Sequence, residues 1–343
     1  MQAVILVGGE GTRLRPLTAT VPKPVVPLVD RPFIVYMLEW LRRHGVDDVI
    51  MSCGFKADRV RDALGDGSQF GLALRYLEEP EPRGTAGALK YAEEHLAERF
   101  LMLNGDVLSD MDLSAQVAQH EATGATATLA LVPVEDPSAY GLVRIGGDNA
   151  VKGFLEKPSP EEIDTDLISA GAYVLDRSIL DLIAPDLNVS IEREIWPQLV
   201  GNGLYAFPHQ AYWLDIGTPQ TYLQATFDIL EGNVETAVTE HIGPGCDIAA
   251  DAHVGRVTVL GPNVKVGAHS RIDRAVVLEG SEIGAHCELS ACIVGPGARI
   301  GDHTRVAGGA VLGEGVEVGA NCVLANGIKV FPGTRLGEGS VRF

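Results

Sequence analysis

Two different hydrophobic periods divide this chain. Up to about residue 232, short apolar runs alternate with stretches in which apolar residues recur at helical spacing. In chain order, these strand-like and helix-like segments are 3–7, 33–44, 48–53, 85–96, 100–103 and 126–132. Pro32 opens the first helical segment and Gly45 ends it. The alternation predicts an α/β fold, with a Rossmann-like, mostly parallel sheet and helices on both faces.

A six-residue period replaces this pattern from about residue 240. Seventeen branched or leucine residues keep the period, apart from two five-residue steps, and many of them precede a glycine. These anchors are Ile242, Ile248, Val254, Leu260, Val266, Ile272, Val277, Ile283, Leu289, Val294, Ile300, Val306, Leu312, Val318, Leu324, Val330 and Leu336. Such hexapeptide repeats are typical of a left-handed parallel β-helix, here of five to six coils. We therefore expect two domains, residues 1–235 and 236–343.

Charge and cysteine content narrow the possible functions. The formal charge of −19 argues against binding to nucleic acids and to anionic membranes, which require basic patches. The apolar run at the N-terminus is five residues long and has no basic flank, so we expect no signal peptide and a cytoplasmic protein. The five cysteines lack metal-site spacing and are typical of free thiols. A zinc site from His286, Cys287 and Cys292 is disfavoured, because a place in the repeat explains Cys246, Cys287 and Cys322 better.

A glycine-rich loop follows the first strand. Gly8, Gly9 and Gly11 allow the backbone N–H groups to approach an anion, and Arg13 and Lys23 add positive charge. The loop matches neither a P-loop, which needs a lysine directly after the glycines, nor a dinucleotide loop, whose third glycine is replaced by Leu14. The pattern indicates a different kind of nucleotide-phosphate site.

The whole N-terminal string, G-G-x-G-T-R-L-x-P-L-T followed by P-K-P, closely resembles the signature of the sugar-1-phosphate nucleotidyltransferases. Further motifs of that family follow in order over roughly residues 1 to 230. They are L-N-G-D at 103–106, F-L-E-K-P at 154–158, S-A-G-A-Y at 169–173, S-I-E-R-E at 190–194 and W-L-D-I-G at 213–217. The resemblance implies that a nucleoside triphosphate and a sugar 1-phosphate give a nucleotide sugar and pyrophosphate.

The resemblance also implies roles for individual residues. The expected catalytic residues are Arg13, Lys23, Asp106 and Lys157. The expected nucleotide-binding residues are Leu6, Gly8, Gly9, Gly11, Thr12, Arg13, Glu79, Gly84, Thr85 and Ala86. The expected sugar-phosphate-binding residues are Gly141, Glu156, Lys157 and Gly171. Asp106 and Asp215 are expected to bind Mg²⁺, a cation that takes few carboxylates and completes its shell with phosphates and water.

The chemistry of nucleotidyl transfer agrees with this set of expected site residues. The attacking phosphate oxygen is already anionic, so no general base is required, and positioning and charge stabilisation must drive the reaction. Taken singly, Asp106 is explained by a helix cap or turn, and Glu156-Lys157 by a solvated surface pair. Asp215 is explained by the loop before a helix, for which Thr218 is the expected N-cap and Pro219 the expected first residue. Taken together and in family order, the functional interpretation is favoured. Glu192 and Glu194 stay open between supporting the fold and contacting sugar hydroxyls.

The segment 78–89 bears on the base and the sugar. It resembles the E-E-P-x-G-T-A-G segment of mannose-1-phosphate guanylyltransferases, and the glutamine-containing pattern of many thymidylyltransferases is not matched. GTP and mannose 1-phosphate are therefore the favoured substrates, with thymidylyl or uridylyl transfer to glucose 1-phosphate as the alternative. Two other classes are an enzyme with a second, acyltransferase activity in the β-helix and a non-catalytic regulatory paralogue.

The chain end suggests self-association. A β-helix leaves an exposed terminal coil, and residues 331–332 and 341–343 at this end are largely apolar. We expect a homo-oligomer that assembles through the β-helix.

Overall fold

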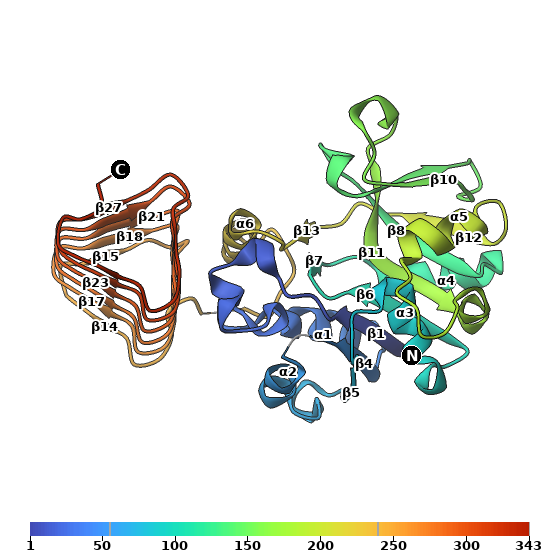
Figure 1. Ribbon diagram of the computed structural model, residues 1–343, viewed down its shortest axis with the longest axis horizontal. Coiled ribbons are helices and arrows are strands. Elements are labelled where there is room, and N and C mark those ends of the chain that lie inside the picture. The colour runs from blue at the N-terminus through green and yellow to red at the C-terminus, as the bar shows by residue number, and fades with distance from the viewer. Residues whose placement is uncertain (55, 239, 343) are drawn as a thin grey trace. The chain divides into compact units, whose positions relative to one another are not determined.

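The computed structural model describes residues 1–54, 56–238 and 240–342 (Figure 1). Its contacts divide the chain into two compact units, one of residues 1–9 and 34–213 and the other of residues 10–33 and 214–343. The expected boundary at 235/236 falls inside the second unit, and it stays a prediction about domains. The second unit thus contains Arg13 and Lys23 in addition to the β-helix.

Nine strands form the sheet in the described part of the first unit. They are β1 (Gln2–Val7), β4 (Asp48–Cys53), β5 (Ala73–Glu78), β6 (Arg99–Asn104), β8 (Ala127–Pro133), β9 (Gly141–Ile145), β10 (Val151–Glu156), β11 (Leu167–Asp176) and β12 (Leu204–Pro208). The order along the main path is β10-β9-β11-β6-β1-β4-β5, and β8 joins β11 to β12. Strands β5, β4, β1 and β6 run parallel, as the β-α-β pattern predicts.

The other half of the sheet is mixed in direction. Strand β11 runs antiparallel to β6, β8 and β9, and β9 runs antiparallel to β10. The expected Rossmann-like sheet is confirmed, with parallel strands on one side and mixed pairing on the other. The antiparallel pairing of β9 with β10 has a local cause, because the turn that joins these strands is too short for a parallel connection.

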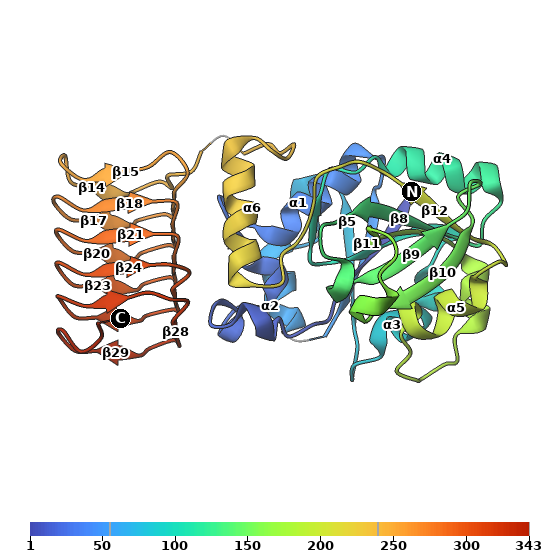
Figure 2. The ribbon, with the colours of Figure 1, turned by 90° about the horizontal axis from the view of Figure 1, so that it is seen from above.

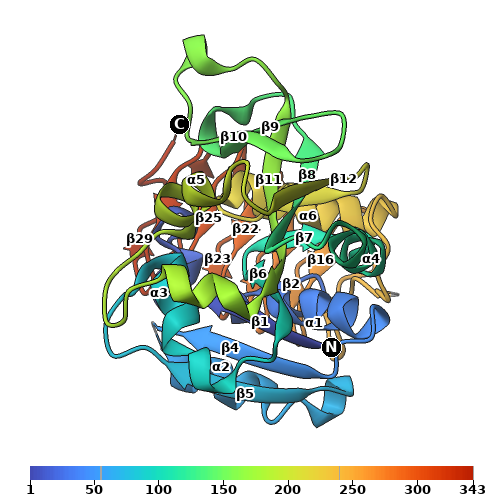
Figure 3. The same cartoon turned by 90° about the vertical axis from the view of Figure 1, so that its right-hand side faces the viewer.

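Helices cover both faces of this sheet. In chain order the α-helices of the first unit are α1 (Phe33–Arg43), α2 (Ala57–Leu64), α3 (Gly84–Tyr91), α4 (Leu113–Thr123) and α5 (Trp196–Leu199), whereas α6 (Pro219–Glu231) belongs to the second unit. In Figure 3, α1 and α4 lie on one face, and α3 and α5 on the other. The predicted helix at 85–96 is shorter than expected, because a 3₁₀ turn, η5 (Glu93–His95), replaces its last turn.

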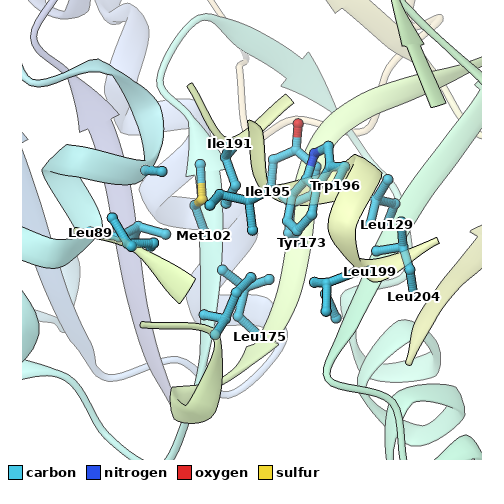
Figure 4. Packing of buried hydrophobic residues seen from close by; sticks show 14 of the residues in the cluster. Leu89, Met102, Leu129, Tyr173, Leu175, Ile191, Ile195, Trp196, Leu199 and Leu204 are labelled. Carbon is cyan, nitrogen blue, oxygen red and sulfur yellow. The ribbon is translucent and has the colours of Figure 1, made fainter. Parts of the chain in front are cut away.

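One hydrophobic core lies between the sheet and the helices α3 and α5. Figure 4 shows Trp196 and Tyr173 in contact range of Leu129, Leu199 and Ile195. The two rings are tilted, with centroids 5.3 Å apart. Burial of aromatic side chains of this size gives the largest single apolar contributions to such a core.

The N-terminal part of the second unit contains three short 3₁₀ helices, η1 (Thr12–Leu14), η2 (Leu17–Ala19) and η3 (Lys23–Val25), followed by two short strands, β2 (Pro27–Leu28) and β3 (Arg31–Pro32); its later part contains α6. Thr218 caps α6 by accepting a hydrogen bond from the Thr221 N–H, and Pro219 is its first residue. This is the start that the sequence predicts. Strand β13 (Trp213–Asp215) precedes it, and β7 (Val107–Ser109) follows β6 in the first unit.

Two-residue and three-residue strands build the β-helix. They are β14 (Asp247–Ile248), β15 (His253–Val254), β16 (Val259–Leu260), β17 (Lys265–Val266), β18 (Arg271–Asp273), β19 (Val276–Val277), β20 (Glu282–Ile283), β21 (Glu288–Ser290), β22 (Ile293–Val294), β23 (Arg299–Ile300), β24 (Arg305–Ala307), β25 (Val311–Leu312), β26 (Glu317–Val318), β27 (Val323–Leu324), β28 (Lys329–Val330) and β29 (Arg335–Leu336). Within residues 240–342 they form three parallel sheets, β14-β17-β20-β23-β26-β29, β15-β18-β21-β24-β27 and β16-β19-β22-β25-β28. Figure 2 shows the coils stacked in one column.

The predicted anchors stack in register. Val266 pairs with Ile283, and Ile283 with Ile300, so each of these two coils is 17 residues long. The next coil, from Ile300 to Val318, has 18 residues. The two five-residue steps in the sequence are thus absorbed without loss of register. Burial of each such anchor side chain stabilises the folded state by about 1.5–3 kcal/mol relative to leaving it exposed.

Left-handed backbone at the corners explains the composition of the repeats. His269, His286 and His303 have φ values of 59°, 56° and 57°, and glycines and asparagines occupy similar corners. Neighbouring imidazoles have centroids 4.8 Å apart; the rings of His286 and His303 are stacked, and the His269 ring is tilted by 32° against that of His286. All three side chains are exposed. All five cysteines are free, and the thiols of Cys287 and Cys322 donate to backbone carbonyls inside the coils.

The apolar residues near the end of the chain differ in their exposure to solvent. Phe331 is exposed, Val341 is half-buried, and Phe343 lies outside the described residues. Across residues 1–54, 56–238 and 240–342, no helix has the length and apolar character needed to span a membrane.

Candidate active site

The glycine loop leaves β1 beside the end of β4. Gly8 and Gly9 are exposed, and a side chain on Gly54 would place its Cβ 2.8 Å from the Gly8 carbonyl oxygen. The backbones of the two loops are therefore in direct contact. A Cβ on Gly8 would lie 3.8 Å from Oε1 of Glu79, so that carboxylate borders the loop. Leu6, the residue before the end of β1, pairs with the end of β6.

Glu79 is fixed by three hydrogen bonds. Its N–H donates to the Cys53 carbonyl at 2.9 Å. Its carboxylate accepts from the Ser52 hydroxyl at 2.7 Å and from the Arg83 N–H at 3.3 Å. Ser52 lies on β4, and neither the hydrophobic pattern nor the composition of that strand predicts that its hydroxyl binds Glu79. The carboxylate keeps further acceptor capacity, because each oxygen has two lone pairs.

The start of α3 is tied to residues 187–191. The Ala86 N–H donates to the Val189 carbonyl at 2.9 Å. Gly84 has φ +70°, and an added Cβ would lie 2.5 Å from the same carbonyl oxygen. The predicted nucleotide-binding residues Gly84 and Ala86 thus also hold two segments of the fold together.

Thr85 links α3 to Glu192. Its hydroxyl donates to Oε2 of Glu192 at 2.8 Å and accepts from the Ile191 N–H at 2.8 Å. The Ser190 hydroxyl donates to the same Glu192 oxygen at 2.7 Å. The question left open for Glu192 is partly answered, because this carboxylate supports the local structure.

Three carboxylates in the first unit raise the pKa of the Tyr173 hydroxyl. Burial raises the pKa of Tyr173, and the negative charges of Glu192, Glu156 and Asp106 raise it further. Burial also raises the pKa of Glu156, and the charge of Glu192 adds to this effect. The structure therefore brings Asp106, Glu156 and Glu192 into one acidic region. The motifs that contain them are about 35 to 50 residues apart in the sequence.

Asp106 lies in the turn between β6 and β7, where it is half-buried. The preceding residue, Gly105, donates its N–H to the Leu6 carbonyl at 3.0 Å. A Cβ on Gly105 would lie 2.5 Å from Cγ1 of Val7. Only glycine therefore fits against β1 here, and this close packing sets where Asp106 leaves the sheet.

Lys157 follows β10 in an unusual backbone conformation. Its φ is +54°, in the left-handed region, and its N–H donates to the Tyr140 carbonyl at 3.0 Å. Such a conformation costs a non-glycine residue about 1–3 kcal/mol and is frequent at functional sites. The side chain is exposed. Gly141 pairs with Glu156 across β9 and β10, and an added Cβ would lie 2.5 Å from the Phe154 ring.

Gly171 lies in a bulge of β11. Its φ is +73°, and an added Cβ would lie 3.0 Å from Nδ2 of Asn104. Beside it, Nε1 of Trp213 donates to the Ala170 carbonyl at 2.8 Å, and the Trp213 ring packs edge-on against Tyr140 at 5.2 Å. Trp213 thus joins the bulge to the strand that carries Gly141. Sequence reasoning gave Trp213 no role, although it lies in a family motif.

The second unit gathers opposite charges at Asp215. Nη2 of Arg13 lies 3.6 Å from Oδ2 of Asp215, and Nζ of Lys23 lies 4.0 Å from Oδ1. The Lys23 side chain is 10% exposed and that of Asp215 is 18%, whereas that of Arg13 is 64% exposed. A Cβ on Gly217 would lie 2.7 Å from Nη2 of Arg13, so glycine lets the guanidinium lie flat against the backbone.

The loop before Arg13 is ordered by its own hydrogen bonds. Gly11 has φ +61°, and its carbonyl accepts from the Thr18 hydroxyl at 2.7 Å. A Cβ on Gly11 would lie 3.1 Å from Cβ of Lys23. Thr12 is exposed at the start of the short helix η1 (Thr12–Leu14).

Residues 2–232 match the family model described as nucleotidyl transferase, and residues 237–341 match the model described as GMPPB C-terminal domain. The chain belongs to the nucleotidyl transferase family. The resemblance inferred from the motifs is confirmed.

Similar proteins agree with this membership. The chain is 36% identical over 293 residues to a mannose-1-phosphate guanylyltransferase of Mycobacterium tuberculosis, covering 82% of this chain and 81% of that protein. It is 36% identical to a probable mannose-1-phosphate guanylyltransferase of Oryza sativa subsp. japonica, covering 82% of each. The crystal structure of HddC from Yersinia pseudotuberculosis matches with a TM-score of 0.58 and 32% identity, covering 65% of this chain and 97% of that one. Its complex with GMP-PN matches with a TM-score of 0.57. The relatives are sugar-1-phosphate nucleotidyltransferases, so this nucleotidyl transferase is an enzyme of that class.

Proposed function

We propose that the protein transfers GMP from GTP to the phosphate of mannose 1-phosphate, giving GDP-mannose and pyrophosphate. The observation that carries this proposal is the similarity to mannose-1-phosphate guanylyltransferases over 82% of the chain. The sequence contains all the residues that the motifs predict, Arg13, Lys23, Asp106, Lys157 and Asp215, and this supports the proposal.

In the proposed reaction an oxygen of the sugar phosphate attacks the α-phosphorus of the triphosphate. The bond from that phosphorus to the bridging oxygen breaks, and pyrophosphate leaves with the electron pair. The nucleophile is already anionic, so no residue has to remove a proton. The barrier lies in bringing two polyanions together and in the charge that develops on pyrophosphate.

Arg13 and Lys23 are suited to different parts of this task. The exposed guanidinium of Arg13 is free to follow the charge on the leaving phosphates, and it offers paired donors to their oxygens. The buried ammonium of Lys23 is a fixed positive charge near the same carboxylate. We assign Arg13 to the departing pyrophosphate and Lys23 to the triphosphate.

Mg²⁺ fits the donors present. Among the described residues no three His, Cys, Asp or Glu side chains converge in a way that would hold a metal ion. Mg²⁺ is usually bound by one or two carboxylates, with phosphates and water as the other ligands. We propose Asp106 and Asp215 as those carboxylates. When bound, the ion would offset the negative charge of the phosphates.

We propose that Glu79 recognises the base of the nucleotide. Guanine presents an N1–H and a 2-amino group on one edge, and one carboxylate accepts a hydrogen bond from each. Thymine and uracil present a single N3–H there. Because Glu79 borders Gly8 and is held by Ser52 and the Arg83 N–H, its position is defined before any ligand binds. This preorganisation favours GTP.

Lys157, Glu156, Gly141 and Gly171 are the proposed sugar-phosphate residues. The exposed ammonium of Lys157 is suited to the phosphate. The half-buried carboxylate of Glu156 is suited to sugar hydroxyls, which donate hydrogen bonds to it. Gly141 and Gly171 keep strands β9 and β11 free of side chains beside these groups.

The test is a panel of five nucleoside triphosphates against the 1-phosphates of mannose, glucose and N-acetylglucosamine, followed by pyrophosphate release. We expect GTP with mannose 1-phosphate to give the highest kcat/KM and Asp106→Asn to give none. A tenfold or greater preference for TTP or UTP would overturn the base assignment. Absence of pyrophosphate release for every pair would overturn nucleotidyl transfer itself. Acetyl transfer from acetyl-CoA to an amino-sugar phosphate would establish the bifunctional alternative.

A further inference from the structure

The carboxylate of Glu79, in the loop between β5 and α3, is held by one donor on each of its oxygens. The Ser52 hydroxyl donates to Oε1 at 2.7 Å, and the Arg83 N–H donates to Oε2 at 3.3 Å. The carboxylate therefore cannot turn about its last torsion angle without losing a hydrogen bond. Each oxygen has a second lone pair left for a ligand. The position of the Arg83 N–H thus bears directly on what Glu79 can bind.

The backbone of this loop offers few alternative donors. Two of the residues 80–83 are prolines, which have no N–H. The Arg83 N–H is therefore one of two backbone donors in this stretch, and it reaches back four residues to the Glu79 carboxylate. A change in the position of Arg83 changes this contact.

Both the side chain and the backbone of Arg83 are fixed to neighbouring elements. Its guanidinium carbon lies 4.8 Å from the centre of the Tyr91 ring, within the range of a cation–π contact. Nη1 of Arg83 donates to Oδ1 of Asp186 at 2.9 Å. The Arg83 carbonyl accepts from the Val189 N–H, also at 2.9 Å. The arginine thus joins α3 to the segment 186–189.

Tyr91 connects this guanidinium to the other end of the loop. Its hydroxyl donates to the carbonyl of Glu78 at 3.3 Å, and Glu78 is the last residue of β5. The ring of Tyr91 contacts Arg83, and its hydroxyl contacts Glu78. Both ends of the short segment that contains Glu79 therefore meet at one side chain.

Stability gives little reason for an arginine at this position. The side chain is 11% exposed, and across residues 1–54, 56–238 and 240–342 its Nε has no hydrogen-bond partner. A buried donor without a partner lowers the stability of the fold. The Asp186 side chain is 84% exposed, so solvent screens the ion pair and its contribution is small. A methionine of similar length would fill the same space without leaving a donor unpaired.

We propose that Arg83 is a positioning residue for base recognition. Its side chain, held over the Tyr91 ring, keeps its own backbone N–H on the Glu79 carboxylate. This inference rests on the proposed function, because it takes Glu79 as the group that accepts the two donors of guanine. Without the guanidinium, the loop end at residue 83 is less fixed, and Glu79 turns out of the plane in which it accepts both donors. Uracil offers a single donor and therefore loses less.

Steady-state kinetics with GTP and UTP test the positioning role, measured as the ratio of the two kcat/KM values. We expect Arg83→Met to lower the preference for GTP about three- to tenfold, the range for loss of one hydrogen bond, and to leave the KM for mannose 1-phosphate unchanged. The midpoint of thermal unfolding should not fall. Arg75→Met is the matched control, because Arg75 lies on β5 before the loop and pairs with Asp48 at the surface. It should leave the ratio unchanged.

Glu79→Gln separates failure of this inference from failure of the proposed function. An unchanged ratio in Glu79→Gln contradicts the base assignment, whereas a changed ratio there with an unchanged ratio in Arg83→Met contradicts the positioning role alone. Because Arg83 acts through Glu79, Arg83→Met should have no further effect on the ratio in the Glu79→Gln background.

Three results would overturn the positioning role. They are an equal loss of preference in both backgrounds, an equal effect of Arg75→Met, and a fall in thermal stability that accounts for the lost activity. If Arg83→Met does not fold, Tyr91→Leu makes the same test, since it removes the ring beneath the guanidinium and keeps the arginine. It should lower the preference for GTP in the same direction, and an unchanged ratio would overturn the inference.

Discussion

Replacement of Asp215 by asparagine separates two roles that the structure gives to one carboxylate. Asp215 is a proposed metal ligand, and it also lies 4.0 Å from the Lys23 ammonium and 3.6 Å from the Arg13 guanidinium. Asparagine keeps the shape but removes the charge. The buried Lys23 then loses an opposing charge that helps to offset its desolvation.

The size of this effect follows from the geometry. Two unit charges 4 Å apart interact by about 4 kcal/mol at the effective dielectric of sites near a protein surface. The exposed Arg13 adds at most about 1 kcal/mol, because solvent screens it. Since the Lys23–Asp215 distance is at the outer limit of an ion pair, we expect Asp215→Asn to lower the free energy of unfolding by about 2–4 kcal/mol.

A double-mutant cycle provides the assay. Urea unfolding is measured for Asp215→Asn, Lys23→Met and the double variant, and pyrophosphate release for each. We expect the double variant to regain most of the lost stability, because both charges are gone, yet to remain inactive. Asp164→Asn is the control, since its exposed pair with Arg144 should contribute less than about 1 kcal/mol. Unchanged stability of Asp215→Asn would refute the ion-pair reasoning, and near-normal turnover at limiting Mg²⁺ would refute the metal role.

Three further outcomes are expected. Arg13→Ala should lower kcat more than it changes the KM for sugar 1-phosphate, whereas Lys157→Ala should mainly raise that KM; steady-state kinetics would show a reversed pattern if the roles are exchanged. Glu79→Gln should reduce the preference for GTP over UTP, measured as a ratio of kcat/KM, and an unchanged ratio would remove Glu79 from base recognition. Burial lowers the pKa of His120 below its ordinary value of about 6.5, so the unfolded state takes up the proton first as the pH falls. The free energy of unfolding should therefore decrease below about pH 6.5, and this decrease should be smaller in His120→Gln; equal pH profiles would contradict the assignment.

The sequence predicted best where a repeated physical constraint acts on every turn. In the β-helix each inward anchor must fill the same narrow interior, so the six-residue period and even the two shortened coils can be read directly from the sequence. Strand β4 and the start of α6 were likewise predicted from local signals, a buried run and a Thr-Pro cap. Local chemistry determines these features.

Strand direction and long-range contacts were not accessible in this way. Nothing in the composition of residues 167–176 shows that β11 runs antiparallel to β6, because both parallel and antiparallel buried strands are apolar. The contact of Thr85 with Glu192 joins residues 107 positions apart. The stack of His269, His286 and His303 was missed although its 17-residue spacing equals one coil, because histidine was weighed only as a catalytic or metal-binding residue.

The charge distribution of the first unit gives a physical reason for a divalent cation in the proposed reaction. The negative charges of Asp106, Glu156 and Glu192 all raise the pKa of Tyr173. The region that contains the proposed sugar-phosphate-binding residues is therefore acidic. Lys157 and Arg193 are the cations that act on Glu156, and two cations do not offset three carboxylates and a substrate phosphate. Hydrogen bonds from the hydroxyls of Ser190 and Thr85 hold the Glu192 carboxylate in position. Phosphate binding beside these groups therefore requires added positive charge, and a bound Mg²⁺ would provide it where the protein alone does not.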